Sequence, residues 1–248
     1  MKKTLMLSLL LAGLSSAGIF SATPASAASD VMVKVTAEGA SKYVDDVGIL
    51  FSEDSYALGG VEVDYKGFYV GAQKMVPLFG GDGLEYKNDF RNEAIYSAGY
   101  RYDEKGGFVA ELGMRYHDLV QSLAIAEYSA KVGYHVTPGV TPFAKITYHA
   151  NNDEAKENAV LLFGGADFYA KLSEKASING TAMLFHNGGE LGSEAAYGYS
   201  LKIEPTYAVT EHVALSASLR YVNVFGKDVI GYEENGQVVA GIGTKITF

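Results

Sequence analysis

Apolar and polar residues alternate along most of the chain after residue 30, which is the pattern of a β-strand with different surroundings on its two faces. In the stretch 122–136, Tyr128 and Val132 share one face, whereas Glu127 and Lys131 share the other. Counting such stretches predicts twelve strands of about ten or more residues each. They are 31–43, 55–65, 68–77, 91–102, 107–118, 122–136, 140–150, 158–172, 176–187, 194–208, 212–225 and 236–248.

The connections between these strands alternate between two kinds. Those after every second strand are tight and carry turn residues: Lys66-Gly67, Asp103–Gly106, Thr137–Gly139, Ser173–Lys175 and Val209–Glu211. The others are longer and polar, at 44–54, 78–90, 151–157, 188–193 and 226–235, with a short exception near 119–121. Short turns at one end and long loops at the other are typical of barrels that span an outer membrane. With an even strand number, both termini are expected at the short-turn end, on the periplasmic side.

The length and facing of the strands support the same interpretation. Strands of soluble domains typically run to about 5–6 residues, roughly half the length predicted here. Tyrosines recur near strand ends, as the aromatic girdles of membrane barrels require: Tyr43, Tyr65, Tyr102, Tyr116, Tyr148 and Tyr207. We therefore predict an all-β fold, a transmembrane antiparallel up-and-down β-barrel of about twelve strands. A soluble β-sandwich is the alternative, because alternation alone does not say whether the apolar face meets lipid or a core.

The first 27 residues have the pattern of a secretory signal peptide. Lys2 and Lys3 precede a mostly apolar stretch from Leu5 to Phe20, and Ala25-Ser26-Ala27 matches a small-x-small cleavage site. The expected organisation is a signal peptide at 1–27 and a barrel at 28–248. No cysteine is present, which excludes disulfides and thiolate sites. The net charge of −9 argues against a nucleic-acid partner.

Charged residues near the middle of strands fall on the less apolar face and would point into the barrel. Such side chains can line a water-filled pore and set ion selectivity, or pair across a narrow interior and fill it. Both roles remain open from the sequence. The candidate lumen-lining residues are Glu62, Glu111, Arg115, Glu127, Lys131, Lys145, Asp167, Lys171, Lys202, Glu204 and Arg220.

The long loops are acidic, so divalent cations are candidate partners there. Their carboxylates are hard oxygen ligands, although no segment has the spacing of a defined calcium loop. The simpler interpretation is a solvated loop surface. The residues concerned are Asp45, Asp46, Glu53, Asp54, Asp82, Glu85, Asp89, Asp153, Glu154, Glu157, Glu233 and Glu234.

Three histidines near the long-loop end raise the question of catalysis. His117, His149 and His186 could serve a lipid hydrolase with Ser122 as nucleophile, which would require a Ser–His hydrogen bond and an orienting group. No Gly-x-Ser-x-Gly motif accompanies them. Phosphate-binding, zinc and dinucleotide motifs are also missing, so we predict neither an enzyme nor a cofactor.

The final strand carries a resemblance. Apolar residues alternate with small or polar ones from Val238 to Phe248, and this segment resembles the C-terminal strand of Gram-negative outer-membrane β-barrels. In that superfamily the terminal aromatic residue belongs to the signal that the barrel-assembly machinery recognises, which would give Phe248 this role. Segments 214–227 and 238–248 are also similar to the end of YfaZ-type small outer-membrane proteins, a group that implies no established substrate.

The resemblance implies residence in the outer membrane, contact with lipid and lipopolysaccharide, and a porin-like or structural role. We predict a narrow channel for passive diffusion of small polar solutes or ions. The alternatives are a non-conducting structural or adhesion barrel and, second, a lipid-modifying enzyme. In each case the last strand must pair with the first, because an open sheet edge is not tolerated in lipid.

Overall fold

A computed structural model gives the fold, and it describes residues 31–44, 50–52, 55–78, 93–104, 106–119, 123–151, 158–188, 196–225 and 236–248. Within these ranges every regular element is a strand, and no helix is long and apolar enough to cross a membrane. The predicted signal peptide lies outside the described residues. The strands are β1 (Val31–Ala40), β2 (Tyr43–Val44), β3 (Leu50–Ser52), β4 (Tyr56–Tyr65), β5 (Phe68–Pro77), β6 (Glu93–Asp103), β7 (Phe108–Leu119), β8 (Leu123–Tyr134), β9 (Val140–Asn151), β10 (Ala159–Lys171), β11 (Ala176–Asn187), β12 (Ala196–Ala208), β13 (Val213–Phe225) and β14 (Gln237–Thr247).

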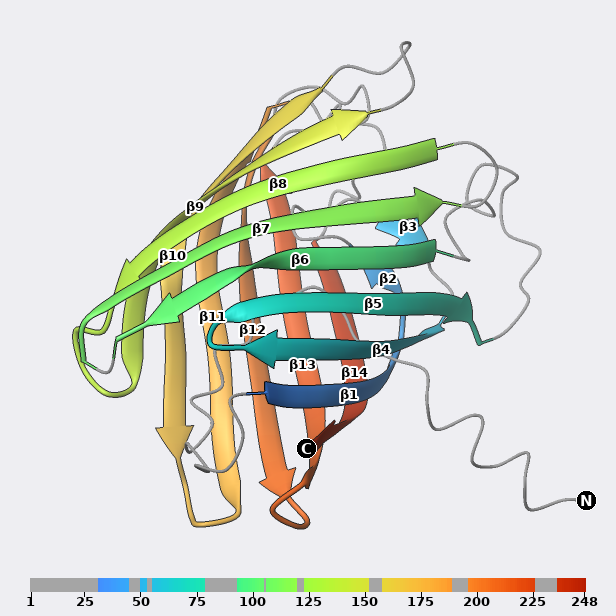
Figure 1. The fold of residues 1–248 in the computed structure, drawn as a ribbon. Helices are drawn as coiled ribbons and strands as arrows, with labels where there is room; N and C mark the ends of the chain where they lie inside the picture. The colour runs from blue at the N-terminus through green and yellow to red at the C-terminus, as the bar shows by residue number, and fades with distance from the viewer. Residues whose placement is uncertain are drawn as a thin grey trace, which may run out of the picture.

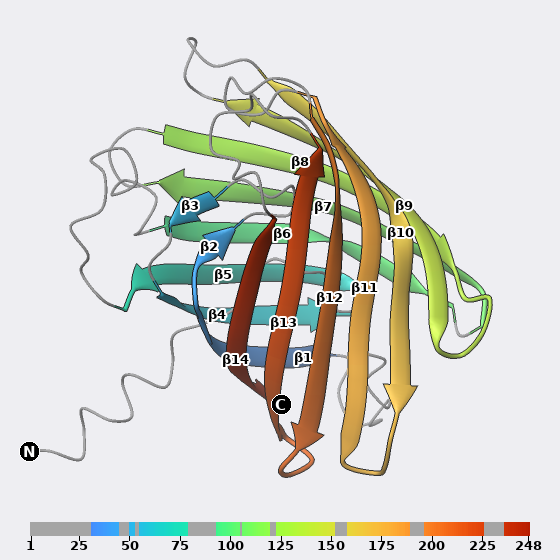
Figure 2. The same cartoon turned by 180° about the vertical axis from the view of Figure 1, so that it is seen from behind.

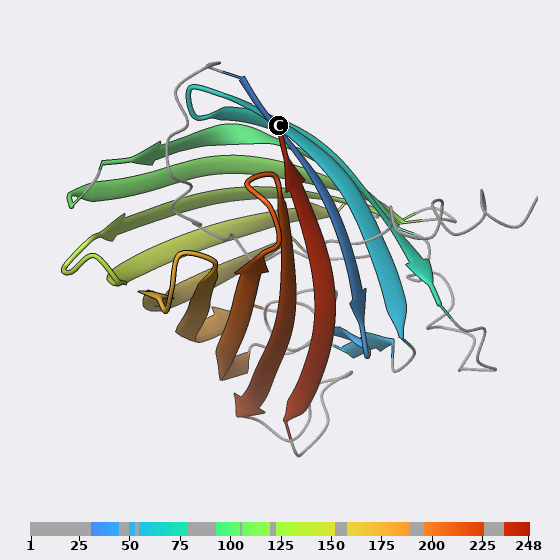
Figure 3. The same cartoon turned by 90° about the horizontal axis from the view of Figure 1, so that it is seen from below.

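Twelve of these strands, all except β2 and β3, form one closed antiparallel barrel (Figures 1 and 2). Each strand pairs with its neighbours in sequence, so the predicted up-and-down barrel is confirmed. Closure depends on β1, because Lys34 lies opposite Glu62 of β4 on one side and Thr247 of β14 on the other. Figure 3 shows β14 running beside β1 to the C-terminus. The barrel therefore has no free edge for another chain to extend.

The two ends of the barrel differ. One, called the short-turn end, carries tight reversals such as the one at Lys66-Gly67, where φ is 52° and 89°. Positive φ at both central residues is the type I′ geometry that matches the twist of the flanking strands. The opposite end, called the long-loop end, carries the remaining connections. The predicted strands agree with the observed ones to within a few residues.

The outer surface is apolar over the height of the wall. Large side chains that point outward are highly exposed, including Leu112 at 62%, Leu184 at 66% and Ile242 at 72%. Exposed tyrosines and phenylalanines stand near the strand ends, among them Phe68 and Tyr207. An apolar belt bounded by aromatic residues is the surface that a lipid bilayer stabilises.

The connection between β1 and β4 contains structure that the sequence did not predict. The stretch 44–54 was expected to be an irregular loop, but β2 and β3 form a short antiparallel pair, with Tyr43 opposite Ser52. Ser55 also donates its hydroxyl to the carbonyl of Ser41 at 3.4 Å, which brings the two ends of this connection together. Such short strands escape detection because two or three residues carry too little alternation to measure.

Deleting Phe248 tests the predicted role of the last residue. Its backbone exchanges two hydrogen bonds with Val33, at 2.9 and 3.1 Å, and its ring stacks on His212 at 6.4 Å between centroids. Loss of these contacts should cost a folded barrel only about 1–3 kcal/mol. If the aromatic residue is also an assembly signal, insertion in cells should fall much more than the stability of refolded barrels.

The measurement compares heat-modifiable barrel in membranes with the unfolding of refolded protein in detergent. The control is His212→Ala, which removes the stacking partner but leaves Phe248 in place, and which should insert normally. Normal insertion of the deletion variant would contradict the role of Phe248 as a signal.

Candidate functional site

The charged face of the strands points into the barrel. This follows from side chains that reach each other across an intervening strand, which only the concave side of a curved sheet allows. Arg101 on β6 binds Glu62 on β4, across β5, and Lys131 on β8 binds Asp167 on β10, across β9. The eleven candidate lumen residues have the same facing as these four or belong to them.

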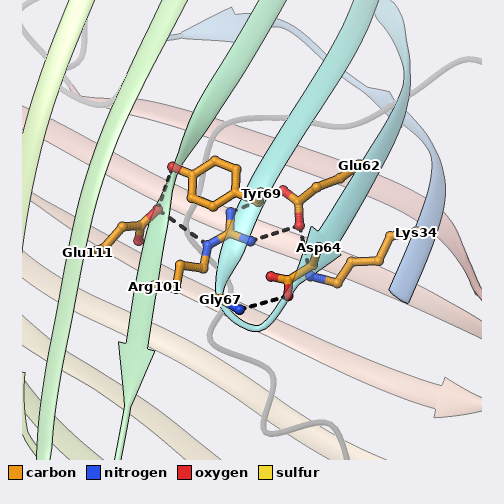
Figure 4. Close-up of polar contacts among 7 residues, drawn as sticks. All are labelled: Lys34, Glu62, Asp64, Gly67, Tyr69, Arg101 and Glu111. Carbon is orange, nitrogen blue, oxygen red and sulfur yellow. Dashed lines mark hydrogen bonds and ion pairs between the residues drawn. The ribbon is translucent and has the colours of Figure 1, made fainter. Parts of the chain in front are cut away.

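Five residues from five strands form one group, called here the arginine cluster: Lys34, Glu62, Tyr69, Arg101 and Glu111 (Figure 4). The Arg101 guanidinium donates to both oxygens of Glu62, at 2.8 and 3.0 Å, and its Nε reaches Glu111 at 3.4 Å. Lys34 donates to Glu62 at 2.8 Å. A two-pronged guanidinium–carboxylate contact fixes orientation as well as distance.

Tyr69 forms the floor of this cluster. Its ring lies 3.7 Å from the Arg101 guanidinium carbon, and its hydroxyl donates to Glu111 at 3.0 Å. The ring can lie flat against the wall because Gly99 and Gly113 stand beneath it. A Cβ at either glycine would come within 2.6 Å of the Tyr69 hydroxyl. Two glycines on neighbouring strands thus make room for one aromatic side chain, which in turn carries the arginine.

The same construction recurs further around the barrel, on β8 to β10. Lys131 donates to Asp167 at 2.7 Å, Thr181 donates to the second oxygen of that carboxylate at 2.8 Å, and the Lys131 ammonium lies 4.1 Å above the ring of Phe143. Phe143 is on β9, the strand that the ion pair crosses. In both places an aromatic residue on the middle strand supports a cation that bridges the strands on either side.

A third group, the histidine cluster, lies nearer the long-loop end and contains Glu93, Arg115, His117, Glu127 and His149. His117 Nδ1 lies 2.5 Å from Glu93 and its Nε2 lies 3.4 Å from Glu127. Arg115 and His149 approach Glu127 at 3.6 and 3.9 Å. Glu93 and Glu127 are almost fully buried. Carboxylates in such surroundings require paired charges, because the desolvation of a lone charge is very costly.

The remaining candidate residues are placed singly or in pairs. Lys202 contacts Glu204 at 2.7 Å on the same strand. Lys145 lies 5.0 Å from the ring of Phe163. Arg220 donates to the carbonyl of Val44 in β2. Lys171 is the last residue of β10 and is exposed at the short-turn end, away from the clusters.

Sequence reasoning missed four members of these clusters: Lys34, Tyr69, Glu93 and Arg101. The signal for Arg101 was present, since Ser97, Gly99 and Arg101 alternate with three tyrosines and an alanine in 96–102. Lys34 stands between Val33 and Val35 and follows the same rule. Tyr69 could not be assigned in this way, because an aromatic residue suits either face of a barrel strand.

Of the histidines considered for hydrolysis, His117 and His149 both approach Glu127, at 3.4 and 3.9 Å, whereas His186 lies apart from them. His186 points outward, where its ring packs on Tyr197 at 4.5 Å, and both ring nitrogens of His117 face carboxylates. Ser122 and the acidic loop residues lie outside the described parts of the chain. Among the described residues, no cluster of three or more histidine and carboxylate side chains is arranged to hold a metal ion.

Solved structures with the same fold are outer-membrane barrels. The NanC porin has a TM-score of 0.61 at 10% identity, with 86% of this chain and 98% of that chain covered. The KdgM porin has a TM-score of 0.58 at 12% identity, with 87% and 99% covered. An outer-membrane channel from Pseudomonas putida F1 has a TM-score of 0.56 at 11% identity, with 95% and 100% covered. No family model and no curated protein matches the chain. The chain thus has the fold of the porin-like outer-membrane β-barrels.

The close packing beneath Tyr69 leads to a test of the wall. In Gly99→Ala the new methyl group would lie 2.3 Å from the backbone oxygen of Leu112 as well as against Tyr69. A backbone contact cannot be relieved by turning a side chain, so we expect a loss of about 1–3 kcal/mol in unfolding free energy.

The matched control is Gly164→Ala, because nothing lies within 4 Å of a Cβ built at Gly164. The measurement is the urea concentration at the midpoint of unfolding of refolded barrels. The folded fraction is read from the gel mobility of unheated samples. Equal midpoints for the two variants would show that the wall adjusts freely around Tyr69.

Proposed function

We propose that the protein is an outer-membrane channel through which small polar solutes or ions diffuse passively. The observation that carries the proposal is the contrast between the two faces of the wall. The outer face exposes large apolar side chains, whereas the inner face holds ionic side chains that are partly open to water, such as Glu62 at 24% and Arg101 at 27% exposure. Charges on a protein's inner wall are kept at lower cost where water reaches them.

The balance of charge along the wall suggests a channel of weak preference. The arginine cluster contains two cations, Lys34 and Arg101, and two carboxylates, Glu62 and Glu111. Because each cation of the cluster lies next to a carboxylate, a passing ion is attracted by one group and repelled by its neighbour, whatever the sign of the ion. Such a wall favours hydrated polar solutes over apolar ones, and it gives neither cations nor anions a large advantage.

The similarity to porins supports the class of function and the outer-membrane location, but it supplies no substrate. The KdgM porin has also been solved in complex with disordered oligogalacturonate, at 11% identity and a TM-score of 0.56. Every cation cluster described in the present barrel contains carboxylates as well. We therefore propose small polar solutes in general rather than an acidic saccharide.

The proposed surroundings follow from the outer surface. Lipid and lipopolysaccharide would contact the apolar belt, and the barrel-assembly machinery would bind the last strand. Divalent cations at the acidic loops remain part of the proposal and rest on sequence alone. The finer relationship to YfaZ-type proteins rests on the similarity of segments 214–227 and 238–248, and it adds no substrate.

A non-conducting structural barrel is the second candidate, and one observation favours it. The inner charges are paired with each other, as in Lys131–Asp167 and Lys202–Glu204, so that they could serve mainly to hold the wall together. A lipid-modifying enzyme has no comparable support, because His117 is held by two carboxylates.

Single-channel recording in planar bilayers separates these candidates. Folded protein purified from outer membranes should produce discrete current steps in potassium chloride. Heat-modifiable barrels that give no current at any potential would exclude the channel and leave the structural barrel.

Two substitutions in the arginine cluster should change ion selectivity in opposite directions. Glu62→Gln leaves Lys34 and Arg101 facing a single carboxylate, so the channel should shift toward anions. Arg101→Gln leaves two carboxylates facing Lys34, so it should shift toward cations, each by roughly a factor of two in the permeability ratio.

The reversal potential in a salt gradient measures both shifts. The control is Lys175→Gln, in the exposed turn between β10 and β11, which should leave the reversal potential unchanged. Two shifts of the same sign would mean that the arginine cluster does not face the ion path.

A further inference from the structure

After β1 the chain bends inward over its neighbour instead of leaving the barrel. Ser41 extends the β1–β14 pairing, since its N–H donates to the carbonyl of Ala240 at 2.9 Å and its hydroxyl accepts from the N–H of Ala240 at 3.1 Å. Lys42 then donates to the side chain of Gln237, and the carbonyl of Val44 accepts from Arg220. The segment Ser41–Val44 is therefore tied first to β14 and then to β13.

The contact with Arg220 shows on which side of the wall this segment lies. Arg220 is directly opposite Lys202 in the β12–β13 register, and Lys202 contacts the inward-facing Glu204. Its guanidinium reaches the backbone of β2 across β14, on the concave face. In Figures 1 and 2 the β2–β3 pair lies between the β4–β7 wall and the β13–β14 wall, at the long-loop end.

Val44 is packed as a core residue would be. It is 4% exposed, and it belongs to a cluster of buried residues with Leu58 on β4, Met75 on β5 and Val239 on β14. These strands lie on both sides of β1. An apolar side chain from a connecting segment thus fills space inside the barrel at this end.

The inward side chains are also more deeply buried toward the long-loop end than toward the short-turn end. Many inward residues near the long-loop end are almost fully buried, whereas some charges nearer the short-turn end keep partial exposure. Asp167, for example, retains 18% exposure and Lys34 also 18%. The buried residues include Tyr56, Leu58, Met75, Glu93, Leu161, Asn187, Val222, Gln237 and Val239. Side chains around Val44 thus fill the interior at the long-loop end more completely than Lys34 and Asp167 fill it further down the wall.

We propose that the segment Lys42–Val44 forms the size-limiting constriction of the channel, and that Arg220 is the positioning residue that holds it against the wall. The proposal rests on the proposed channel function. Arg220 suits this task because its planar donors bind a backbone carbonyl, a contact that does not depend on the side chain at position 44. Without it, the segment keeps the Lys42–Gln237 contact and its packing, but it loses this hydrogen bond to β13.

The first test is Arg220→Met compared with Lys202→Met. Both variants remove one inward cation from the same level of the wall, but the ion pair of Lys202 is with Glu204 and not with β2. Arg220→Met should raise single-channel conductance by about 1.5- to 2-fold and admit larger neutral oligosaccharides in liposome-swelling assays. Lys202→Met should change selectivity but leave the size limit unchanged.

The second test needs no loss of Arg220. The protein contains no cysteine, so Lys42→Cys provides a single thiol at the constriction. A cationic methanethiosulfonate reagent should reduce the current through Lys42→Cys channels in discrete steps. The control is Lys74→Cys, at an exposed position on the outward face of β5, where the same reagent should leave the current unchanged.

The outcomes separate the constriction from the channel itself. The constriction would be overturned if Arg220→Met had the conductance of the wild-type channel and the same size limit as Lys202→Met. It would also be overturned if the reagent left the current through Lys42→Cys channels unchanged. If Arg220→Met fails to fold, the Lys42→Cys experiment decides alone. If folded wild-type barrels carry no current, the proposed function is lost, and the constriction with it.

Discussion

The hydrogen bonding of the backbone is the constraint on which the rest of this structure depends. In a bilayer no water is present to bind unpaired N–H and C=O groups, so a sheet can span it only if the sheet has no edge. β1 meets this condition by pairing with β4 and β14 at once, down to the contact between Val33 and Phe248. Closure also divides every strand into an outward and an inward set of side chains. The apolar outer belt and the charged inner wall are consequences of that division.

Once the wall is closed, its inner face has to accommodate charges at close quarters. The barrel does this twice with the same arrangement, in which an aromatic ring on one strand supports a cation that pairs with a carboxylate two strands away. Tyr69 under Arg101 rests on two glycines, and Phe143 lies under Lys131. The ring covers one side of the cation, and the carboxylate pairs with another. Such supports hold charges in fixed positions, which a selective or weakly selective channel requires.

The two ends of the lumen have different physical roles. Toward the short-turn end, Lys34 and Asp167 keep partial exposure. Toward the long-loop end, Val44 and the buried residues around it exclude water. Arg220, a residue whose charge would otherwise line the pore, links β13 to the backbone of β2. If the protein is the proposed channel, charge would govern passage at the short-turn end, and size would govern it at the long-loop end.

The sequence alone determined the class of fold, because alternation, strand length and the segregation of short turns from long loops are local properties of the chain. Alternation also predicts an inward face for the eleven charged candidates, and the same alternation applied to 96–102 would have added Arg101. Only the tertiary structure decided which charges meet. Register and curvature bring Arg101 to Glu62 across β5, and they bring the β2 backbone to Arg220, although 176 positions separate Val44 from Arg220. Contacts of this kind depend on the closed circumference of the barrel, and no window of sequence contains that information.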